Sequence, residues 1–211
     1  WWQEGPLLYE QWTVLDALNV PLESVRVDDP SVLLVRIRIV NTSDQVPATA
    51  SLTLTSEPFD HPGERLVMHG DIVSAVTPEG ARVRLVLPGA DANAWAAGDA
   101  ELRWTRKLGP GESHTLHAMV PSVTLAGEAE VESLRKRDFM EDAARICDFW
   151  TERTAAGTQI ETPEPWLNDF YRTHVRHLLI NCQGEVDSDR LHAHVGSFYY
   201  GDFPNEAIMM I

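Results

Sequence analysis

The run from Leu33 to Asn41 is the sequence feature that most constrains the fold. Its apolar side chains recur at every second position, at Leu33, Val35, Ile37 and Ile39. Arg36 and Arg38 stand between them. Because successive side chains of a strand point to opposite faces, this alternation predicts a strand with one buried face and one polar face.

Similar short runs recur through the first 120 residues, with turn signals between them. They cover 7–15, 50–55, 65–68, 71–76, 81–87, 101–104 and 113–120, and a further short strand is expected where Val25 and Val27 flank Arg26. Residues 41–45 form a turn cluster, so we expect 33–41 and 50–55 to pair as an antiparallel hairpin. Short strands at regular spacing with Gly, Pro and Asp turns indicate an antiparallel β-sandwich rather than a parallel α/β sheet.

After Pro121 the spacing of apolar residues becomes helical. The stretch from Glu128 to Arg153 lacks Gly and Pro, which predicts one long amphipathic linker helix that ends at Gly157. Its basic run 135–137 is interpreted as a solvated face rather than a binding patch.

A second helix is expected to begin after Thr162 as N-cap, with Pro163 in its first position. Trp166 and Phe170 begin one apolar stripe of this helix, and Leu167 and other apolar residues lie beside it. Because both sides are apolar, we expect the helix to be heavily buried.

Charge and composition exclude several classes of partner. The formal net charge is −15 with no clustered Lys/Arg surface, which argues against nucleic acid and against an anionic membrane surface. No apolar run reaches the ~20 residues of a membrane span. Cys147 and Cys182 lie in segments with helical spacing and are interpreted as small buried apolar groups rather than as a disulfide.

The histidines do not predict a metal site, and no cofactor is expected. His114 and His117 are three residues apart on a strand and would face opposite sides. His192 and His194 could share a strand face, but no third ligand stands at a suitable spacing.

The N-terminus carries neither an initiator Met nor a signal peptide, so we expect the natural start to lie upstream of Trp1. The compartment is undetermined from the sequence, with the cytoplasm favoured over secretion. The oligomeric state is also open.

The segment 191–211 combines aromatic, imidazole, carboxylate and amide side chains with two glycines on irregular backbone. Such a mixture suits a polar ligand with apolar faces, which describes a sugar. The candidate ligand-binding residues are Tyr199, Tyr200, Asp202, Asn205 and Glu206. The tyrosines could equally be packing residues, and Asn205 and Glu206 could simply begin a helix.

The whole arrangement resembles the six-hairpin glycosidases, the glucoamylase-like and phosphorylase-like glycoside hydrolases. Two segments carry the resemblance: Ile160-Glu-Thr-Pro-Glu-Pro-Trp-Leu-Asn-Asp-Phe-Tyr171, which opens a helical part, and Phe198-Tyr-Tyr-Gly-Asp-Phe-Pro-Asn-Glu-Ala207. The second is similar to the first barrel loop, which usually lines the sugar subsite. The Arg-Asp pair common in glucoamylase-type loops is not present in it.

The resemblance implies a multidomain β + α protein. The expected domains are an antiparallel β-sandwich (super-sandwich) at 1–125, a linker helix at 126–157, and the first helices of an (α/α)6 toroid at 158–211. The implied activity is hydrolysis of glycosidic bonds in an oligo- or polysaccharide, by a carboxylate pair that would lie beyond Ile211. The catalytic residues are therefore unknown.

Two other functions stay open from the residues alone. One is a non-catalytic carbohydrate-binding or assembly module, which would be favoured by an exposed Trp95 or Trp104 on a sheet. The other is a sugar phosphorylase, which would need an anion site from residues absent from this chain.

Overall fold

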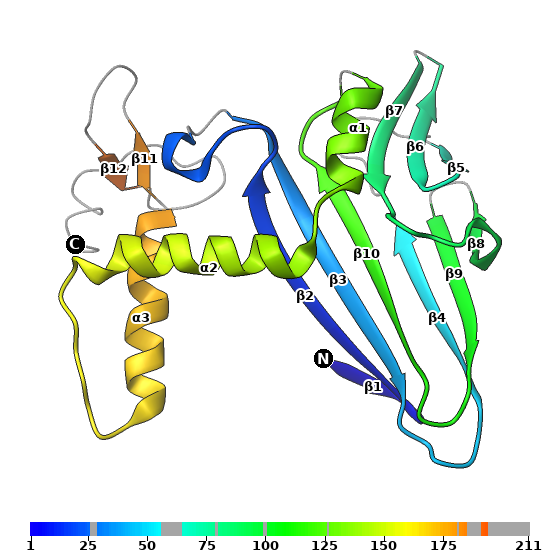
Figure 1. Ribbon diagram of the computed structural model, residues 1–211, viewed down its shortest axis with the longest axis horizontal. Coiled ribbons are helices and arrows are strands. Elements are labelled where there is room, and N and C mark those ends of the chain that lie inside the picture. The colour runs from blue at the N-terminus through cyan, green and yellow to red at the C-terminus, as the bar shows by residue number, and fades with distance from the viewer. Residues whose placement is uncertain are drawn as a thin grey trace. The chain divides into compact units, whose positions relative to one another are not determined.

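The computed structural model describes residues 1–25, 29–55, 65–78, 80–98, 101–125, 127–180, 182–184 and 191–193. The chain divides into two compact units (Figure 1). The first comprises 1–19 and 30–143, and the second comprises 20–29 and 144–211.

The first unit is built on a seven-stranded antiparallel sheet. Its order is β1-β2-β3-β10-β7-β6-β5. The strands are β1 (Trp2–Glu4), β2 (Leu7–Ala17), β3 (Ser31–Asn41), β10 (Ser113–Pro121), β7 (Gly80–Val86), β6 (Ile72–Thr77) and β5 (Arg65–His69). The two longest strands, β2 and β3, pair along their whole length, from Leu7 opposite Asn41 to Ala17 opposite Ser31.

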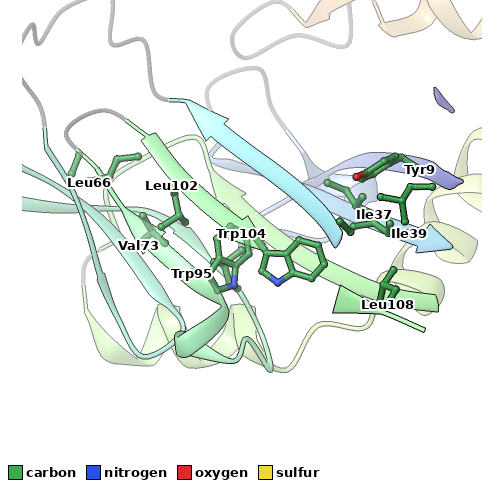
Figure 2. Packing of buried hydrophobic residues seen from close by; sticks show 13 residues of the cluster. Tyr9, Ile37, Ile39, Leu66, Val73, Trp95, Leu102, Trp104 and Leu108 are labelled. Atoms are coloured by element: carbon green, nitrogen blue, oxygen red, sulfur yellow. The ribbon is translucent and has the colours of Figure 1, made fainter. Parts of the chain in front are cut away.

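A three-stranded antiparallel sheet faces part of this large sheet. It contains β4 (Ala48–Thr55), β9 (Glu101–Leu108) and β8 (Trp95–Ala97) in the order β4-β9-β8, and the short 3-10 helix η2 (Ala92–Ala94) precedes β8. Figure 2 shows the cluster between the two sheets, with Trp95 and Trp104 in its middle. This packing confirms two layers of antiparallel sheet, as the alternating strands predicted.

Helices cover part of the other face of the large sheet. Helix α1 (Glu128–Arg135) contributes Val131 and Leu134, and helix α2 (Phe139–Ala155) contributes its first residue, Phe139. They pack with a second buried cluster that includes Leu34 and Met119. Each face of the large sheet therefore carries an apolar region, one packed against the small sheet and the other against the helices.

Strand β3 shows the change of buried face within one strand. Val35, Ile37 and Ile39 face the small sheet, as the alternation predicted. Leu33 is 36% exposed, whereas Leu34 is fully buried beneath the helices. The prediction was therefore wrong at this end, because a helix layer that the strand's own pattern does not encode covers the opposite face there.

The expected hairpin between 33–41 and 50–55 is also wrong. Strand β3 pairs with β2 and β10, and β4 pairs with β9 in the other sheet. The buried side chain of Asn41 holds the crossing, because its Nδ2 donates to the carbonyl oxygens of Val46 (2.9 Å), Leu108 (3.2 Å) and Gly109 (3.0 Å). One amide thus satisfies backbone carbonyls where the chain passes between layers.

The predicted single linker helix is two helices. Helix α1 ends at Arg135 and α2 begins at Phe139. Asp138 starts the new helix, because its Oδ1 accepts hydrogen bonds from the amides of Met140 (2.8 Å) and Glu141 (3.0 Å). Such N-capping explains the break without Gly or Pro.

The second unit contains the rest of α2, the 3-10 helix η1 (Leu22–Ser24), helix α3 (Pro165–Ile180), and the short strands β11 (Cys182–Gly184) and β12 (Leu191–Ala193). Helix α3 starts two residues later than predicted. Thr162 lies before the helix and bonds Asn168, with its amide 2.9 Å from Oδ1 and its carbonyl accepting Nδ2 at 3.0 Å. Asn168 thus fixes the approach to the helix from within it.

Candidate functional site

The predicted sugar-binding loop lies outside the described residues. This applies to Tyr199, Tyr200, Asp202, Asn205 and Glu206, and also to His194. The nearest described structure is the antiparallel pair β11–β12, in which the backbone of His192 lies opposite Gln183. The ligand-contact predictions for this loop therefore stay predictions.

Trp95 and Trp104 are core residues and not a surface platform. Trp104 is 1% exposed and Trp95 is 9% exposed. They are paired across β8 and β9, with ring centroids 6.5 Å apart. The exposed indole that would favour a sheet-face sugar module is absent at both positions.

The described surface of the large sheet carries another tryptophan, Trp12, which is 41% exposed. It lies opposite Arg36 in the register of β2 and β3, and the Arg36 guanidinium lies 4.8 Å from the indole centroid. A cation over a ring face is attracted by the ring quadrupole. Arg36 thus occupies one face of the Trp12 ring, which is a face that a sugar would need for stacking.

His114 and His117 face opposite sides of β10, as predicted. His114 stacks on Trp104 on the side of the small sheet, with ring centroids 5.3 Å apart. His117 stacks on Phe139 on the helix side, with centroids 6.5 Å apart. Burial lowers the pKa of both imidazoles. The guanidiniums of Arg106 and Arg36 lower the pKa of His114 and His117, respectively, further.

Within the described residues, no group of three or more His, Cys, Asp or Glu side chains could hold a metal ion. Cys147 is a free thiol and is exposed, so its predicted burial is wrong. It lies on a face of α2 that the described chain leaves uncovered. None of the described helices is long and apolar enough to cross a membrane.

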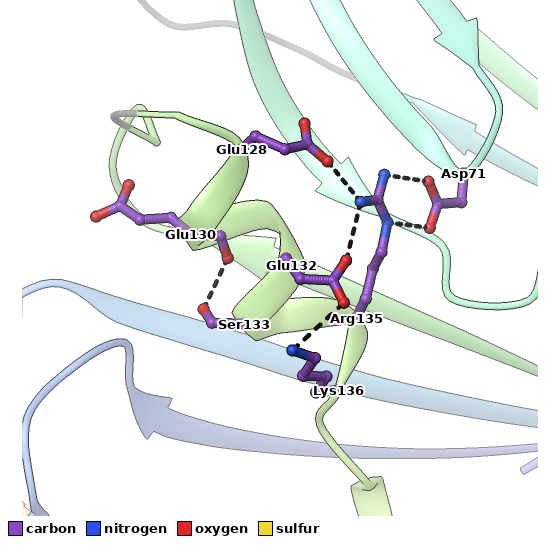
Figure 3. Close-up of polar contacts among 7 residues, drawn as sticks. All are labelled: Asp71, Glu128, Glu130, Glu132, Ser133, Arg135 and Lys136. Carbon is purple, nitrogen blue, oxygen red and sulfur yellow. Dashed lines mark hydrogen bonds and ion pairs between the residues drawn. The ribbon is translucent and has the colours of Figure 1, made fainter.

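The basic run 135–137 is not the solvated face that its composition suggested. Arg135 forms a bidentate pair with Asp71, with Nε 2.8 Å and Nη2 3.0 Å from its carboxylate oxygens, and it also contacts Glu128 and Glu132 (Figure 3). The hydrogen bond from Arg135 lowers the pKa of Asp71 below its ordinary value. This network attaches α1 to the turn before β6.

Arg137 lies deeper than Arg135. Its side chain is 15% exposed and pairs with Asp16, whose side chain is 1% exposed. Its Nε also donates to Asp142 at 3.1 Å. Only Lys136, 73% exposed, behaves as the sequence suggested. The sequence shows that residues 135–137 are basic, but it does not show that Asp16 is buried at the end of β2. The pairing of Arg137 with this buried carboxylate makes Arg137 a structural residue.

An apolar space in the described chain lies between the sheets, with residues of β4 on one side. It is a cavity of about 480 Å³. Its floor includes Val35, Ile37, Leu116 and Ala118, and one wall includes Thr53 and Thr55. We call it the β4 groove. Its volume falls in the range of ligand pockets, roughly 300–1,000 Å³. No sequence pattern indicates this cavity, because it depends on how far the small sheet extends over the large one.

Comparison with known proteins adds no family assignment, since neither a protein-family model nor a curated protein sequence matches the chain.

Proposed function

We propose that this chain is the N-terminal part of a carbohydrate-active glycoside hydrolase. In this proposal the two-layer sandwich precedes a helical (α/α)6 toroid, of which α3 is an early helix. The carboxylate pair that acts on the glycosidic bond would lie beyond this chain.

The observation that carries the proposal is the uncovered apolar surface of α3. The sequence predicted heavy burial, yet no residue of this helix is buried. Trp166 is 68% exposed and Phe170 is 62% exposed, and the two are four positions apart on one helical face. An apolar stripe of this kind needs neighbouring helices, which is what a toroid supplies. The order of elements, with antiparallel sheets first and helices after them, agrees with this arrangement.

The alternative of a sheet-face sugar module has less support. Trp95 and Trp104 are buried, and the exposed Trp12 has Arg36 over its ring. A module would require a free aromatic face that lies flat on a sheet, and these three side chains do not supply one.

The test uses the full-length polypeptide that contains this chain, assayed on a panel of oligo- and polysaccharides. Asp202→Ala should lower kcat/KM about ten- to a hundred-fold, because a hydrogen bond to a charged acceptor contributes about 1.5–3 kcal/mol. The melting temperature should change little. Asn205→Ala is the matched control: as a helix cap it should lower stability by about 1 kcal/mol with little effect on kinetics.

Failure has a distinct signature. If no glycoside in the panel is turned over by the full-length protein, the hydrolase proposal is wrong. If glycosides are cleaved but Asp202→Ala leaves kcat/KM unchanged, the activity stands and the 198–206 loop is not its sugar site.

A further inference from the structure

The β4 groove is bounded by apolar side chains from both layers of the sandwich. Leu52 and Leu54 of β4 line one side. Leu66, Leu85 and Leu87 line the far side, next to the large sheet. All five belong to the hydrophobic cluster between the sheets or pack against it. The groove is therefore an apolar space within the sandwich.

Trp95 of β8 contributes a buried polar group to this lining. The residue is 9% exposed, and its indole Nε1 is buried without a hydrogen-bond partner among the described residues. A buried indole N–H usually has an acceptor, because its hydrogen bond to water is otherwise lost without replacement. An acceptor held in the groove would supply the missing bond.

Trp95 also lies where the groove adjoins a second space. Together with Leu66 it lines a cavity of about 480 Å³ beside β5 and β8, and this cavity is more open to solvent than the groove. A ligand can therefore approach from the more open side and extend past the indole into the apolar lining.

The other polar residues of the lining favour an uncharged ligand. Thr53 and Thr55 alternate along β4 with the leucines that pack against the core, so their side chains point away from it. His117 stacks on Phe139 on the helix side of the large sheet. Arg84 already has an interaction of its own. An ionised group would thus find no free counter-charge among the described lining residues, and burial of an unpaired charge is costly.

We propose that the β4 groove binds a small uncharged molecule with an aliphatic chain and one carbonyl oxygen, such as a methyl ketone. The chain would lie against the leucines of the lining, and the oxygen would accept a hydrogen bond from Nε1 of Trp95. Buried water fits less well, because a buried water makes about three hydrogen bonds and the rest of the described lining is apolar, outward-facing or already engaged. This inference does not depend on the proposed hydrolase activity.

The probes are methyl ketones with butyl, hexyl and octyl chains, titrated into the nitrogen-15-labelled 211-residue chain. Nuclear magnetic resonance follows the indole N–H signals. We expect saturable binding that moves the Trp95 Nε1–H signal downfield. From butyl to hexyl, the Kd should fall about four-fold for each added methylene, because each one buries more apolar surface.

The matched control ligand is the alkene in which a methylene group replaces the carbonyl oxygen of methyl hexyl ketone. It has nearly the same shape and no acceptor, so it should bind without moving the Trp95 Nε1–H signal downfield. This comparison uses the unchanged chain and needs no variant.

Trp95→Phe removes the N–H and keeps an aromatic ring. Because the hydrogen bond is lost only for the ketone, the ratio of ketone affinity to alkene affinity should fall about three- to ten-fold. The smaller ring affects both ligands alike and cancels from this ratio.

A pair of Ala→Leu variants tests where the ligand binds. Ala118 of β10 lines the groove, so Ala118→Leu should occupy part of the ligand's space and weaken ketone binding at least about ten-fold. Ala96 is exposed on β8, and its side chain points to the opposite face from that of Trp95. Ala96→Leu is therefore the matched control and should change the Kd by less than about two-fold.

Three results would overturn the proposal. The first is absence of saturable ketone binding by the unchanged chain. The second is a Trp95 Nε1–H signal that the ketone and the alkene move alike, or an unchanged affinity ratio in a folded Trp95→Phe chain. The third is equal ketone binding by the Ala118→Leu and Ala96→Leu chains.

Discussion

Replacement of Arg137 by Met should be among the most damaging single changes at the sheet–helix junction. Arg137 pairs with the carboxylate of Asp16, and both side chains are largely removed from water, at 15% and 1% exposure. Loss of one partner of a buried ion pair costs about 3–5 kcal/mol, because the other charge stays buried. Asp16 keeps the hydrogen bond that its Oδ1 accepts from the amide of Ala17 at 2.9 Å. We therefore expect the lower end, about 3 kcal/mol of unfolding free energy.

Urea unfolding followed by tryptophan fluorescence measures this loss. With a slope of about 2 kcal/mol per molar urea, the midpoint should fall by about 1.5 M. Lys136→Met is the matched control, because its side chain is 73% exposed and its Nζ lies 3.5 Å from Glu132, so the change should be within about 0.5 kcal/mol.

Removal of the second charge tests the mechanism. Asp16→Asn in the Arg137→Met background keeps the acceptor for Ala17 and removes the buried charge, so part of the lost stability should return. A cost for Arg137→Met no greater than for Lys136→Met would refute the argument. So would a double variant that is no more stable than Arg137→Met alone.

Two further predictions concern the same junction. The pKa of His117 is lowered by burial and by Arg36, so the unfolded chain binds protons more readily, and the unfolding free energy should fall as pH drops below about 6.5. In His117→Phe, which keeps a ring against Phe139, the urea midpoint should depend less steeply on pH. An unchanged pH dependence in this variant would assign the effect to other groups. Asp138→Ala should lower the unfolding free energy by about 1 kcal/mol through loss of the α2 cap. Asp138→Asn keeps an acceptor and should cost less. Equal costs for the two variants would show that the capping oxygen is not responsible.

The sequence alone predicted the longer strands of both sheets and the helical character of the stretch after Pro121. Alternation over 33–41 and 113–120 predicted β3 and β10, and the change of period after Pro121 predicted helices. These patterns are local, because the side-chain direction of a strand or helix repeats within a few residues. The short strands β1, β8, β11 and β12 have three residues each, too few for a period, and were not predicted. Cys182, expected in a helical segment, lies in β11, so that prediction was wrong.

For the candidate site, the sequence identified a chemically suitable loop at 198–206, whose geometry lies outside the described residues. It could not identify the β4 groove. The cavity is lined by residues of both sheets, so it depends on which strands become neighbours and on how the two sheets face each other.

The tertiary structure determined which distant part of the chain packs against each face of a strand or helix. Leu33 and Leu34 are adjacent and equally apolar, yet only Leu34 is buried, because α1 and α2 cover its side of the sheet. Arg137 and Lys136 are adjacent and equally basic, yet only Arg137 meets a buried carboxylate. A side chain's identity sets what it costs to bury it, but the partner that makes burial favourable comes from a distant part of the chain.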